Sequence, residues 1–399
     1  MMVLGSMNDQ LARSGGIERG GRVVPDRPAA PRAQPGADGK PPTIEMVARH
    51  AAVSRQTVSN AFNAPDRLRP ETLQRVRAAI DELGYRPNQA ARSLRSHSTR
   101  VIGCRLLPSN SGGVLDRLLH ALCDAARASG YDVLTFSARD DDEEIEVYTD
   151  LLRRGAVDGF VLTNTHHLDT RPGWLLEHAA RFVAFGRAWG VRRTAHSWVD
   201  VDGAKGTSEA VEHLARLGHN RIAFLGVPAG SGVGDDRYRG WERAAEQLSL
   251  PVKGLAQRAE DGIESGRTLT RRLLESARPP TGIVCVSDSM AIGALRAIED
   301  RGLSAGRDVS VVGFDDSPIA AVLRPGLSSV RQPIESVAHE LIDVLLAELS
   351  ERGRAPARQL LAPRLVVRES SGPAPGASRP PKARRPLPSH TLETKERKQ

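Results

Sequence analysis

The chain has 399 residues, of which 40% are hydrophobic and 26% charged, and this composition is typical of a globular protein with two or three domains. No run of about 18 apolar residues occurs and no apolar stretch follows the basic N-terminus, so we expect no membrane span or secretory signal and predict a cytoplasmic protein. The net charge of +8 is uneven: residues 43–100 carry +5 and residues 101–370 carry −4, so a polyanion is attracted to the first segment and repelled by the second.

The N-terminal part of the chain predicts a disordered segment followed by three short helices. Residues 1–42 are rich in Gly, Pro, Arg and Ala without a hydrophobic period, which is typical of disorder. In residues 43–86, Thr43 and Ser54 are suitable N-caps for the first two helices, and Gly84 is a suitable C-cap for the third. Apolar residues recur at helical spacing, so this segment predicts a small all-α helix-turn-helix domain.

The second of these helices has a polar outer face, which consists of Ser54, Arg55, Gln56, Ser59 and Asn60. Arg, Gln and Asn side chains form paired hydrogen bonds with base edges in the DNA major groove. A solvated helix face is the alternative interpretation. The complete helical pattern around these residues favours DNA reading instead.

Residues 87–100 predict a hinge helix and linker. The stretch from Asn88 to Arg95 is compatible with a helix of about two turns, which is marginal on its own in water. We therefore expect it to form only against a second copy or against DNA. Ala90 and Ala91 would allow a close approach of two copies, with Leu94 projecting.

Residues 101–370 alternate apolar strands with amphipathic helices, which predicts an α/β fold with parallel sheets. About 270 residues exceed what one such sheet needs, so we expect two lobes with a ligand cleft between them, beyond the carboxyl ends of the strands. The three cysteines are odd in number and lie among apolar residues, which favours buried thiols over a disulfide framework. Residues 371–399 form a basic, Pro-rich tail that we expect to be disordered.

Five sequence motifs, in this order and spacing, resemble the lactose-repressor (LacI-type) family of bacterial transcription regulators. They are TIEMVARHAAVSRQTVSNAFN, ELGYRPNQAARSL, HLARLGHNRIAFLG, CVSDSMAIGALRAIEDRGL and VSVVGFDDSPIA, and the resemblance covers residues 43–369. It implies a homodimer, a hinge helix in the minor groove of a near-palindromic, double-stranded operator, and a periplasmic-binding-protein-like core for a small effector.

The resemblance also implies roles for single residues in DNA binding. Arg55, Gln56 and Asn60 match the base-reading positions, whereas Thr43, Ser54, Thr57 and Ser59 match positions for phosphate contacts or capping. Asn88 and Ala91 match the hinge helix, and Leu94 matches the leucine wedged into the central base step. Ordinary packing between hinge and core is the alternative for Leu94. Ala52 stands where the turn usually has Gly, which is tolerable if Ala52 adopts the turn geometry.

For the effector, the resemblance points to Arg237 and Asp315 as the polar pair of the cleft. Arg187, Ser287 and Gln332 are further candidates. A structural ion pair is the alternative for Arg237 and Asp315, and a structural or surface role is the alternative for Arg187 and Gln332. The chain departs from the family where Gly186 replaces an aspartate, Ser287 an asparagine, and Gly112-Gly113 an Asn-Pro, so the effector's identity stays open.

Three other motifs have simpler explanations than a catalytic or metal site. The loop Gly230–Gly234 resembles a phosphate-binding turn, but acidic residues follow it directly, so we expect a flexible cleft loop. The run Asp140–Glu144 suits a helix N-terminus. His166-His167 lacks a companion ligand at metal spacing, so we expect a solvated loop. We predict no catalytic residue, no metal and no cofactor.

We therefore expect a dimeric, effector-controlled regulator, most simply a repressor of a carbohydrate-use operon, with a sugar or sugar derivative as effector. A periplasmic solute-binding protein shares the two-lobed core, but the basic N-terminal domain argues against it. A nucleotide- or sugar-modifying enzyme is the second alternative, and the chain has no nucleophile elbow or Ser/His/Asp signature in its favour. Whether the effector releases or promotes DNA binding stays open.

Overall fold

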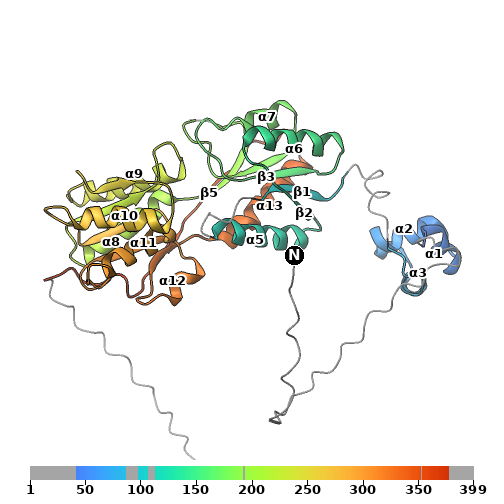
Figure 1. Cartoon of the computed structure of the whole chain (residues 1–399). Coiled ribbons are helices and arrows are strands. Elements are labelled where there is room, and N and C mark those ends of the chain that lie inside the picture. The colour runs from blue at the N-terminus through green and yellow to red at the C-terminus, as the bar shows by residue number, and fades with distance from the viewer. Residues whose placement is uncertain (1–41, 87–97, 107–112, 192–193, 352, 377–399) are drawn as a thin grey trace, which may run out of the picture. The chain divides into compact units, whose positions relative to one another are not determined.

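The computed structural model describes residues 42–86, 98–106, 113–191, 194–351 and 353–376 (Figure 1). The chain divides into two units, residues 1–91 and 92–399. No helix in the described part is long and apolar enough to cross a membrane.

The first unit contains the predicted three-helix domain. Its helices are α1 (Ile44–His50), α2 (Arg55–Asn63) and α3 (Pro70–Leu83), with a 3₁₀ turn at Pro65–Arg67. The Thr43 and Ser54 hydroxyls accept the backbone N–H groups of Met46 and Thr57, so both N-caps are confirmed. Gly84 ends α3 with a left-handed φ of 60°. The core consists of Val47, Ala48, Ala51, Val58, Val76 and Ala79.

The turn between α1 and α2 depends on a non-glycine residue in a left-handed conformation. Ala52 has a φ of 51°, which an L-residue with a Cβ adopts at a cost of about 1–2 kcal/mol. The Val53 N–H donates to the Ala48 carbonyl and closes the turn. Ala52 thus takes the turn geometry on which the helix-turn-helix prediction depends.

Lobe 1 of the second unit is a six-stranded parallel sheet with helices on both faces. Its strand order is β11-β5-β4-β3-β1-β2. The strands are β1 (Val101–Arg105), β2 (Asp132–Phe136), β3 (Gly159–Leu162), β4 (Phe182–Phe185), β5 (Ser197–Val201) and β11 (Arg358–Leu361). Helices α5 (Val114–Ala128) and α13 (Ile334–Ser350) share one apolar core with the sheet, and α6 (Asp141–Arg153) and α7 (Arg171–Glu177) share the other.

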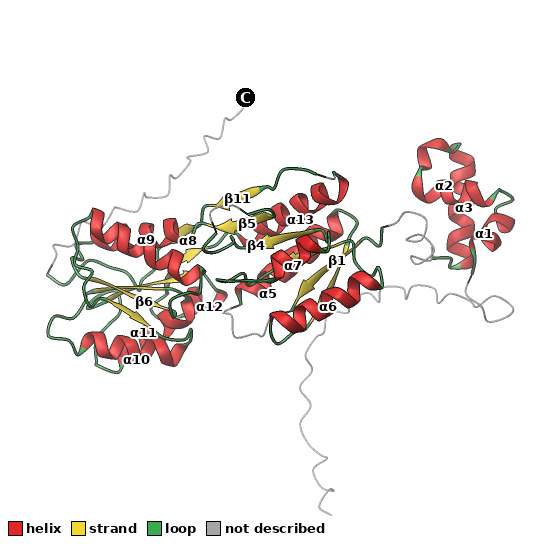
Figure 2. Cartoon of the chain, turned by 90° about the horizontal axis from the view of Figure 1, so that it is seen from above, coloured by secondary structure: helices red, strands yellow, loops and turns green. Residues whose placement is uncertain are grey.

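Lobe 2 repeats this architecture, with strand order β12-β10-β9-β8-β6-β7 and only β12 antiparallel. The strands are β6 (Ile222–Gly226), β7 (Ala256–Arg258), β8 (Gly282–Cys285), β9 (Ser310–Asp315), β10 (Ser328–Arg331) and β12 (Arg364–Val366). Helices α8 (Gly203–Arg216) and α9 (Val233–Gln247) cover one face, and α10 (Ile263–Leu274) and α11 (Asp288–Glu299) cover the other (Figure 2). A short helix, α12 (Pro318–Val322), follows β9.

The chain passes between the lobes three times: from β5 to α8, from β10 to α13, and from β11 to β12. Each lobe is therefore built from separate stretches of sequence. The two predicted lobes and their parallel sheets are confirmed, and the carboxyl ends of the strands face the region where a ligand is expected.

Three strands do not show the apolar run by which the sequence analysis expects a strand, and each has a physical reason. β7 has only three residues at a sheet edge. β11 is an edge strand whose residues alternate between exposed and half-buried. β10 is buried, but it contains Ser328 and Ser329, whose hydroxyls bond to Arg368 and Asp288 rather than forming an apolar run.

The second lobe extends beyond residue 370, where we placed the start of the tail. The Ala374 N–H donates to the Leu217 carbonyl, and the Gly372 carbonyl accepts from His219 Nε2 and the Ser310 hydroxyl. Residues 371–376 thus pack on lobe 2, and the remaining tail lies outside the described residues, as do residues 1–41.

Candidate functional site

The outer face of α2 carries the predicted DNA-reading side chains. Ser54, Arg55 and Gln56 are exposed, and Ser59 and Asn60 are partly exposed. The Gln56 amide donates to Asn60 Oδ1 at 3.0 Å, which places the two amide groups side by side. Arg55 forms an exposed ion pair with Glu45 at 2.9 Å, and such a pair is weak enough to exchange for DNA.

The serine and threonine side chains around this face make hydrogen-bonding contacts within α2 and its N-cap. Ser54 Oγ also lies 2.9 Å from Thr57 Oγ1, and Asn63 donates to Ser59. The Ser54–Thr57 contact fixes the N-terminus of α2, whose free backbone N–H groups attract phosphate, and the Asn63–Ser59 contact lies at the other end of the helix. The predicted hinge residues Asn88, Ala91 and Leu94 lie outside the described residues.

A cavity of about 630 Å³ lies between the two lobes of the core. Four of the five predicted effector residues line it: Arg237, Ser287, Asp315 and Gln332. They come from the start of α9, from the N-cap of α11, from the end of β9, and from the crossing that follows β10. The cavity therefore lies at the carboxyl ends of lobe 2 strands, where the fold class predicts a ligand.

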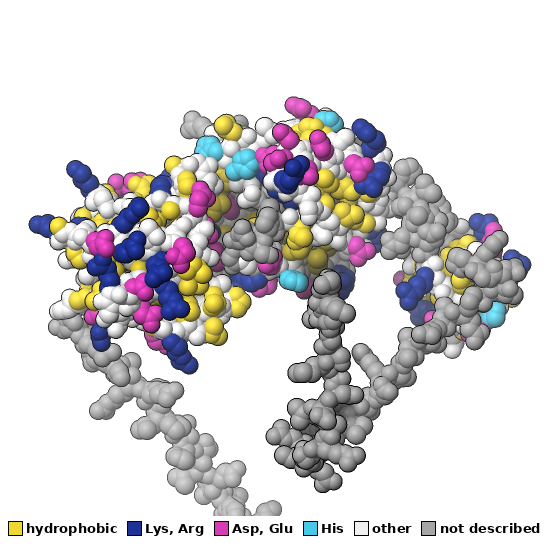
Figure 3. All heavy atoms as spheres, in the orientation of Figure 1, with side chains coloured by type: hydrophobic (Ala, Val, Ile, Leu, Met, Phe, Trp, Pro, Cys, Tyr) yellow, Lys and Arg dark blue, Asp and Glu magenta, His cyan; other side chains and the backbone are white. Residues whose placement is uncertain are grey.

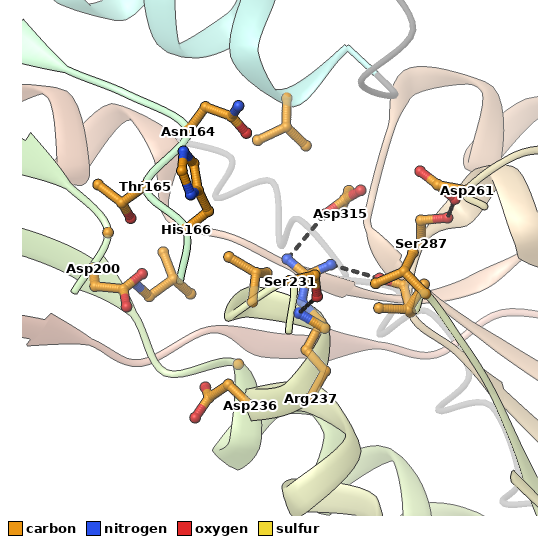
Figure 4. Close-up of a pocket in the computed structure, with 18 of the residues that line it drawn as sticks. Asn164, Thr165, His166, Asp200, Ser231, Asp236, Arg237, Asp261, Ser287 and Asp315 are labelled. Carbon is orange, nitrogen blue, oxygen red and sulfur yellow. Dashed lines mark hydrogen bonds and ion pairs between the residues drawn. The ribbon is translucent and has the colours of Figure 1, made fainter. Parts of the chain in front are cut away.

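Arg237 and Asp315 form the polar centre of this cavity. Figure 4 shows them pointing toward one another, with Arg237 Nη2 3.7 Å from Asp315 Oδ1. Arg237 lies over the Phe314 ring, with its guanidinium carbon 3.7 Å from the ring centroid, and it donates to the Val286 carbonyl. Its Nε has no hydrogen-bond partner in the described part of the chain. The guanidinium thus has unused donor capacity in a buried setting.

Asp315 is held by Gln332, whose amide donates to Asp315 Oδ1 at 2.6 Å. Burial raises the pKa of Asp315 to about 7, although the Arg237 guanidinium and the Gln332 amide act to lower it. The carboxyl group therefore changes charge close to neutral pH. Its φ of 107° is unusual for a residue with a side chain and is typical of a functional site.

Ser287 is less available than predicted. Its hydroxyl caps α11 by accepting the Met290 N–H at 3.1 Å, and it donates to Asp261 Oδ1 at 2.5 Å. Both of its strongest hydrogen-bonding directions are therefore in use. Asp261 also lines the cavity, so its carboxylate is the hydrogen-bond acceptor that the Ser287–Asp261 pair offers to a ligand.

Arg187 does not line the cavity, unlike the other predicted effector residues. Its Nε donates to Asp200 Oδ2 at 2.7 Å and its Nη2 to Asp236 Oδ2 at 2.8 Å. Asp200 lies in the lobe 1 strand β5, whereas Asp236 lies in the lobe 2 helix α9. Arg187 thus joins the two lobes. Arg117 of α5 makes a second connection, with Nη2 3.1 Å from the Asp315 carbonyl oxygen.

Comparison with known proteins agrees with both parts of the structure, the helix-turn-helix domain and the two-lobed core. Residues 43–88 match the family described as bacterial regulatory proteins, lacI family, and residues 211–371 match the periplasmic binding protein-like domain. The regulator CelR of Thermobifida fusca is 32% identical over 338 residues, which cover 82% of this chain and 98% of CelR. The chain belongs to the LacI family.

Solved structures of LacI-family members share the whole fold. The complex of the regulator CelR with cellobiose is 31% identical and has a TM-score of 0.64, covering 83% of this chain and 100% of that one. The lac repressor dimer bound to operator and the anti-inducer ONPF is 27% identical with a TM-score of 0.72, covering 83% and 99%. The protein is thus a DNA-binding transcriptional regulator, and these relatives are regulators rather than enzymes.

Several residues of this LacI-family cleft were missed by the sequence reasoning. They are Asn164, Thr165, Trp189, Asp200, Asp236 and Asp261. Asn164 and Thr165 follow β3, so their position after a strand was the available signal, whereas Asp200 lies within β5, one residue before its end. The loop Gly230–Gly234 lines the cavity as predicted, and Asp235 pairs with Arg258 at 3.0 Å instead of facing a phosphate.

His166 differs from its prediction as a solvated loop residue without a companion ligand. It lines the cavity, and its Nε2 lies 2.9 Å from Asp141 Oδ2. Asp141 is remote in sequence, so spacing along the chain could not reveal it. His166, Asp141 and Asp169 offer ligand atoms within 4.8 Å of one another. Arg171 bonds to Asp169 and pairs with Asp141, so one guanidinium lies against both carboxylates.

The acidic run before these residues has the role predicted for it. Asp140 caps α6 by accepting the Glu143 N–H at 2.9 Å, and the first turn of α6 consists of acidic residues. Acidic side chains gather over α6 and α7 in Figure 3. The run therefore stabilises a helix N-terminus through the helix dipole.

Proposed function

We propose that this LacI-family regulator is a repressor of a carbohydrate-use operon and that a sugar or sugar derivative, bound between the core lobes, controls its binding to a near-palindromic operator. The Arg237–Asp315–Gln332 cluster carries the proposal. It offers a guanidinium donor, a carboxylate acceptor and an amide, a set that suits neighbouring hydroxyl groups. The similar regulator CelR, whose structure is a complex with cellobiose, supports a sugar effector.

In this proposal Arg55, Gln56 and Asn60 read base edges, and Thr43, Ser54, Thr57 and Ser59 contact phosphates or cap helices. Asn88, Ala91 and Leu94 form the hinge helix at the operator centre. The effector contacts Arg237, Asp315 and Gln332, with Ser287 and Arg187 acting through Asp261 and through the Asp200–Asp236 bridge. Changing the angle between the lobes would change the distance between the two hinge helices of a dimer.

Selection from a random pool of duplex DNA with the full-length protein tests the proposal. We expect enrichment of one near-palindromic sequence, and a change in its binding when sugars are added. The absence of any enriched sequence would contradict operator reading. A regulated sequence that responds only to non-carbohydrate metabolites would contradict the sugar effector and leave the regulator role intact.

We expect the protein to be a dimer formed by its core lobes. Helix α13 is followed by Gly, Arg and Pro residues, and the C-terminal residues contain no apolar heptads that would form a tetrameric coiled coil. Sedimentation equilibrium over a range of protein concentrations should fit a dimer. A tetramer that persists on dilution would contradict this assembly.

Effector affinity should depend on the ionisation of Asp315. Because burial raises its pKa to about 7, the carboxyl group is protonated below that pH and loses one acceptor oxygen, and it is ionised above it. A sugar hydroxyl that donates to the carboxylate should bind about tenfold more tightly at one pH unit above the pKa than at one unit below. Calorimetry at both pH values measures the change, and Asp315→Asn should abolish it. An unchanged pH profile in the variant would assign the dependence to another group.

A further inference from the structure

A second cavity of about 400 Å³ lies in lobe 1, beside the interlobe cleft. It is lined by residues 165–169 after β3, by residues of α7, and by residues 188–191 and 194–196 after β4. Thr165, His166 and Trp189 line both cavities. The two spaces therefore adjoin along these side chains.

Trp189 stands at the boundary between the two spaces and reaches lobe 2. A Cβ atom built on Gly232 would lie 2.5 Å from Trp189 Cδ1, so the indole ring rests directly on the backbone of the glycine-rich loop. The Arg187 guanidinium carbon lies 4.8 Å from the ring centroid. Trp189 is only 8% exposed. Its flat ring is thus fixed by contacts from both lobes.

Two polar atoms of residues that line the second cavity have no hydrogen-bond partner among the described residues. They are Trp189 Nε1 and His196 Nε2. His196 is only 7% exposed, and a buried polar group left without a partner is unfavourable, because it has lost its hydrogen bonds to water. Other polar groups there are occupied, because Asp169 bonds to Arg171 and His166 to Asp141.

The chemistry of these two atoms suits hydroxyl groups. Trp189 Nε1 only donates a hydrogen bond. Burial lowers the pKa of His196, with Asp169 acting to raise it and Arg358 to lower it, so the neutral ring can accept or donate at Nε2. Aromatic and apolar walls with a few polar groups are the usual lining of a small-molecule site. Pro172, Leu176 and Val191 supply the apolar part of this lining.

We propose that the lobe 1 cavity is a second subsite, which takes the second pyranose unit of a disaccharide or longer sugar whose first unit occupies the cleft beside Arg237 and Asp315. The inference rests on the proposed function. In this arrangement the sugar chain passes Trp189, and Trp189 Nε1 and His196 Nε2 bond to hydroxyls of the second unit. The subsite makes the regulator selective for oligosaccharides over monosaccharides.

Calorimetry with the full-length protein and glucose, cellobiose, maltose, cellotriose and maltotriose tests this subsite. We expect at least one disaccharide to bind about tenfold or more tightly than glucose. This comparison needs no variant, so it does not depend on the folding of a mutant.

The variant Gly173→Leu tests the location of the subsite. Gly173 lines the lobe 1 cavity and not the cleft, and a Cβ there meets no atom within 4 Å. The added side chain should lower disaccharide affinity about tenfold, as expected when a contact of about 1.4 kcal/mol is lost, and leave glucose affinity unchanged. Glu177→Leu adds the same side chain to α7 at an exposed position outside the lining and is the matched control.

Equal affinities for glucose and the disaccharides would overturn the subsite, as would equal behaviour of Gly173→Leu and Glu177→Leu. The proposed function would then still stand, provided that Asp315→Asn weakens the binding of glucose. Binding of none of these sugars would overturn both the subsite and the proposed sugar effector.

Discussion

The variant Asp315→Ala should lose its response to effector, whereas without effector it should bind the operator as the effector-free wild type does. The substitution removes a buried acceptor that lies 2.6 Å from Gln332 and opposite Arg237, far in sequence from the DNA-reading helix. A hydrogen bond to a charged group contributes about 1.5–3 kcal/mol, so the loss of two should lower effector affinity about 100-fold or more. Calorimetry measures the affinity, and operator retention in a gel measures the DNA binding.

The direction of the operator response depends on the type of effector. With an inducer, Asp315→Ala should stay on the operator at effector concentrations that release the wild type. With a corepressor, it should fail to bind the operator at those concentrations. Asp142→Asn, an exposed position on α6, is the control for loss of an aspartate. Unchanged effector affinity in Asp315→Ala would show that Asp315 is a structural residue and that the effector binds elsewhere.

Gln56→Ala should weaken binding to the selected operator and relax the preference at one base position. The Gln56 amide lies beside that of Asn60 on the exposed face of α2, and a paired contact with a base discriminates by about 1–3 kcal/mol. Affinities for the operator and for its single-base variants measure both effects. The expected loss on the operator is about 5- to 150-fold.

Gln74→Ala provides the matched control, because Gln74 is an exposed glutamine on α3 of the same small domain. It should bind the operator as the wild type does. If Gln56→Ala lowers affinity equally for every DNA sequence, Gln56 contacts the backbone and the base-reading assignment is wrong.

Local sequence signals were sufficient for the helical domain. Caps at Thr43 and Ser54 and the glycine after α3 define its helices, because each acts within one helical turn. The left-handed conformation of Ala52 was also predictable, because the turn requires a positive φ at this position whichever residue occupies it. The polar face of α2 followed from helical periodicity alone.

The cleft was only partly predictable, because its key contacts join residues remote in sequence. Arg187 was placed on the effector, yet the structure gives its guanidinium two carboxylates from different lobes, Asp200 and Asp236. Similarly, the packing of α6 brings Asp141 within hydrogen-bond distance of His166. Such pairs depend on how the two lobes, and the helices and sheet within a lobe, pack together. The order of residues along the chain does not show this packing. The Arg237–Asp315 pair was anticipated through the family resemblance rather than through spacing.

The three passages of the chain between the lobes also constrain the order in which the protein can form during synthesis. Helix α13 fills one face of the lobe 1 sheet, with Val337, Leu341 and Leu345 fully buried, but it is made after β1 to β5 and after most of lobe 2. Until then, only α5 covers this face of the emerging lobe 1 strands, and the apolar residues that α13 covers stay exposed, a state prone to aggregation. Lobe 2 in turn waits for β12 to pair with β10. The two lobes should therefore reach their native state together and late, and a nascent chain arrested before residue 334 should bind chaperones rather than effector.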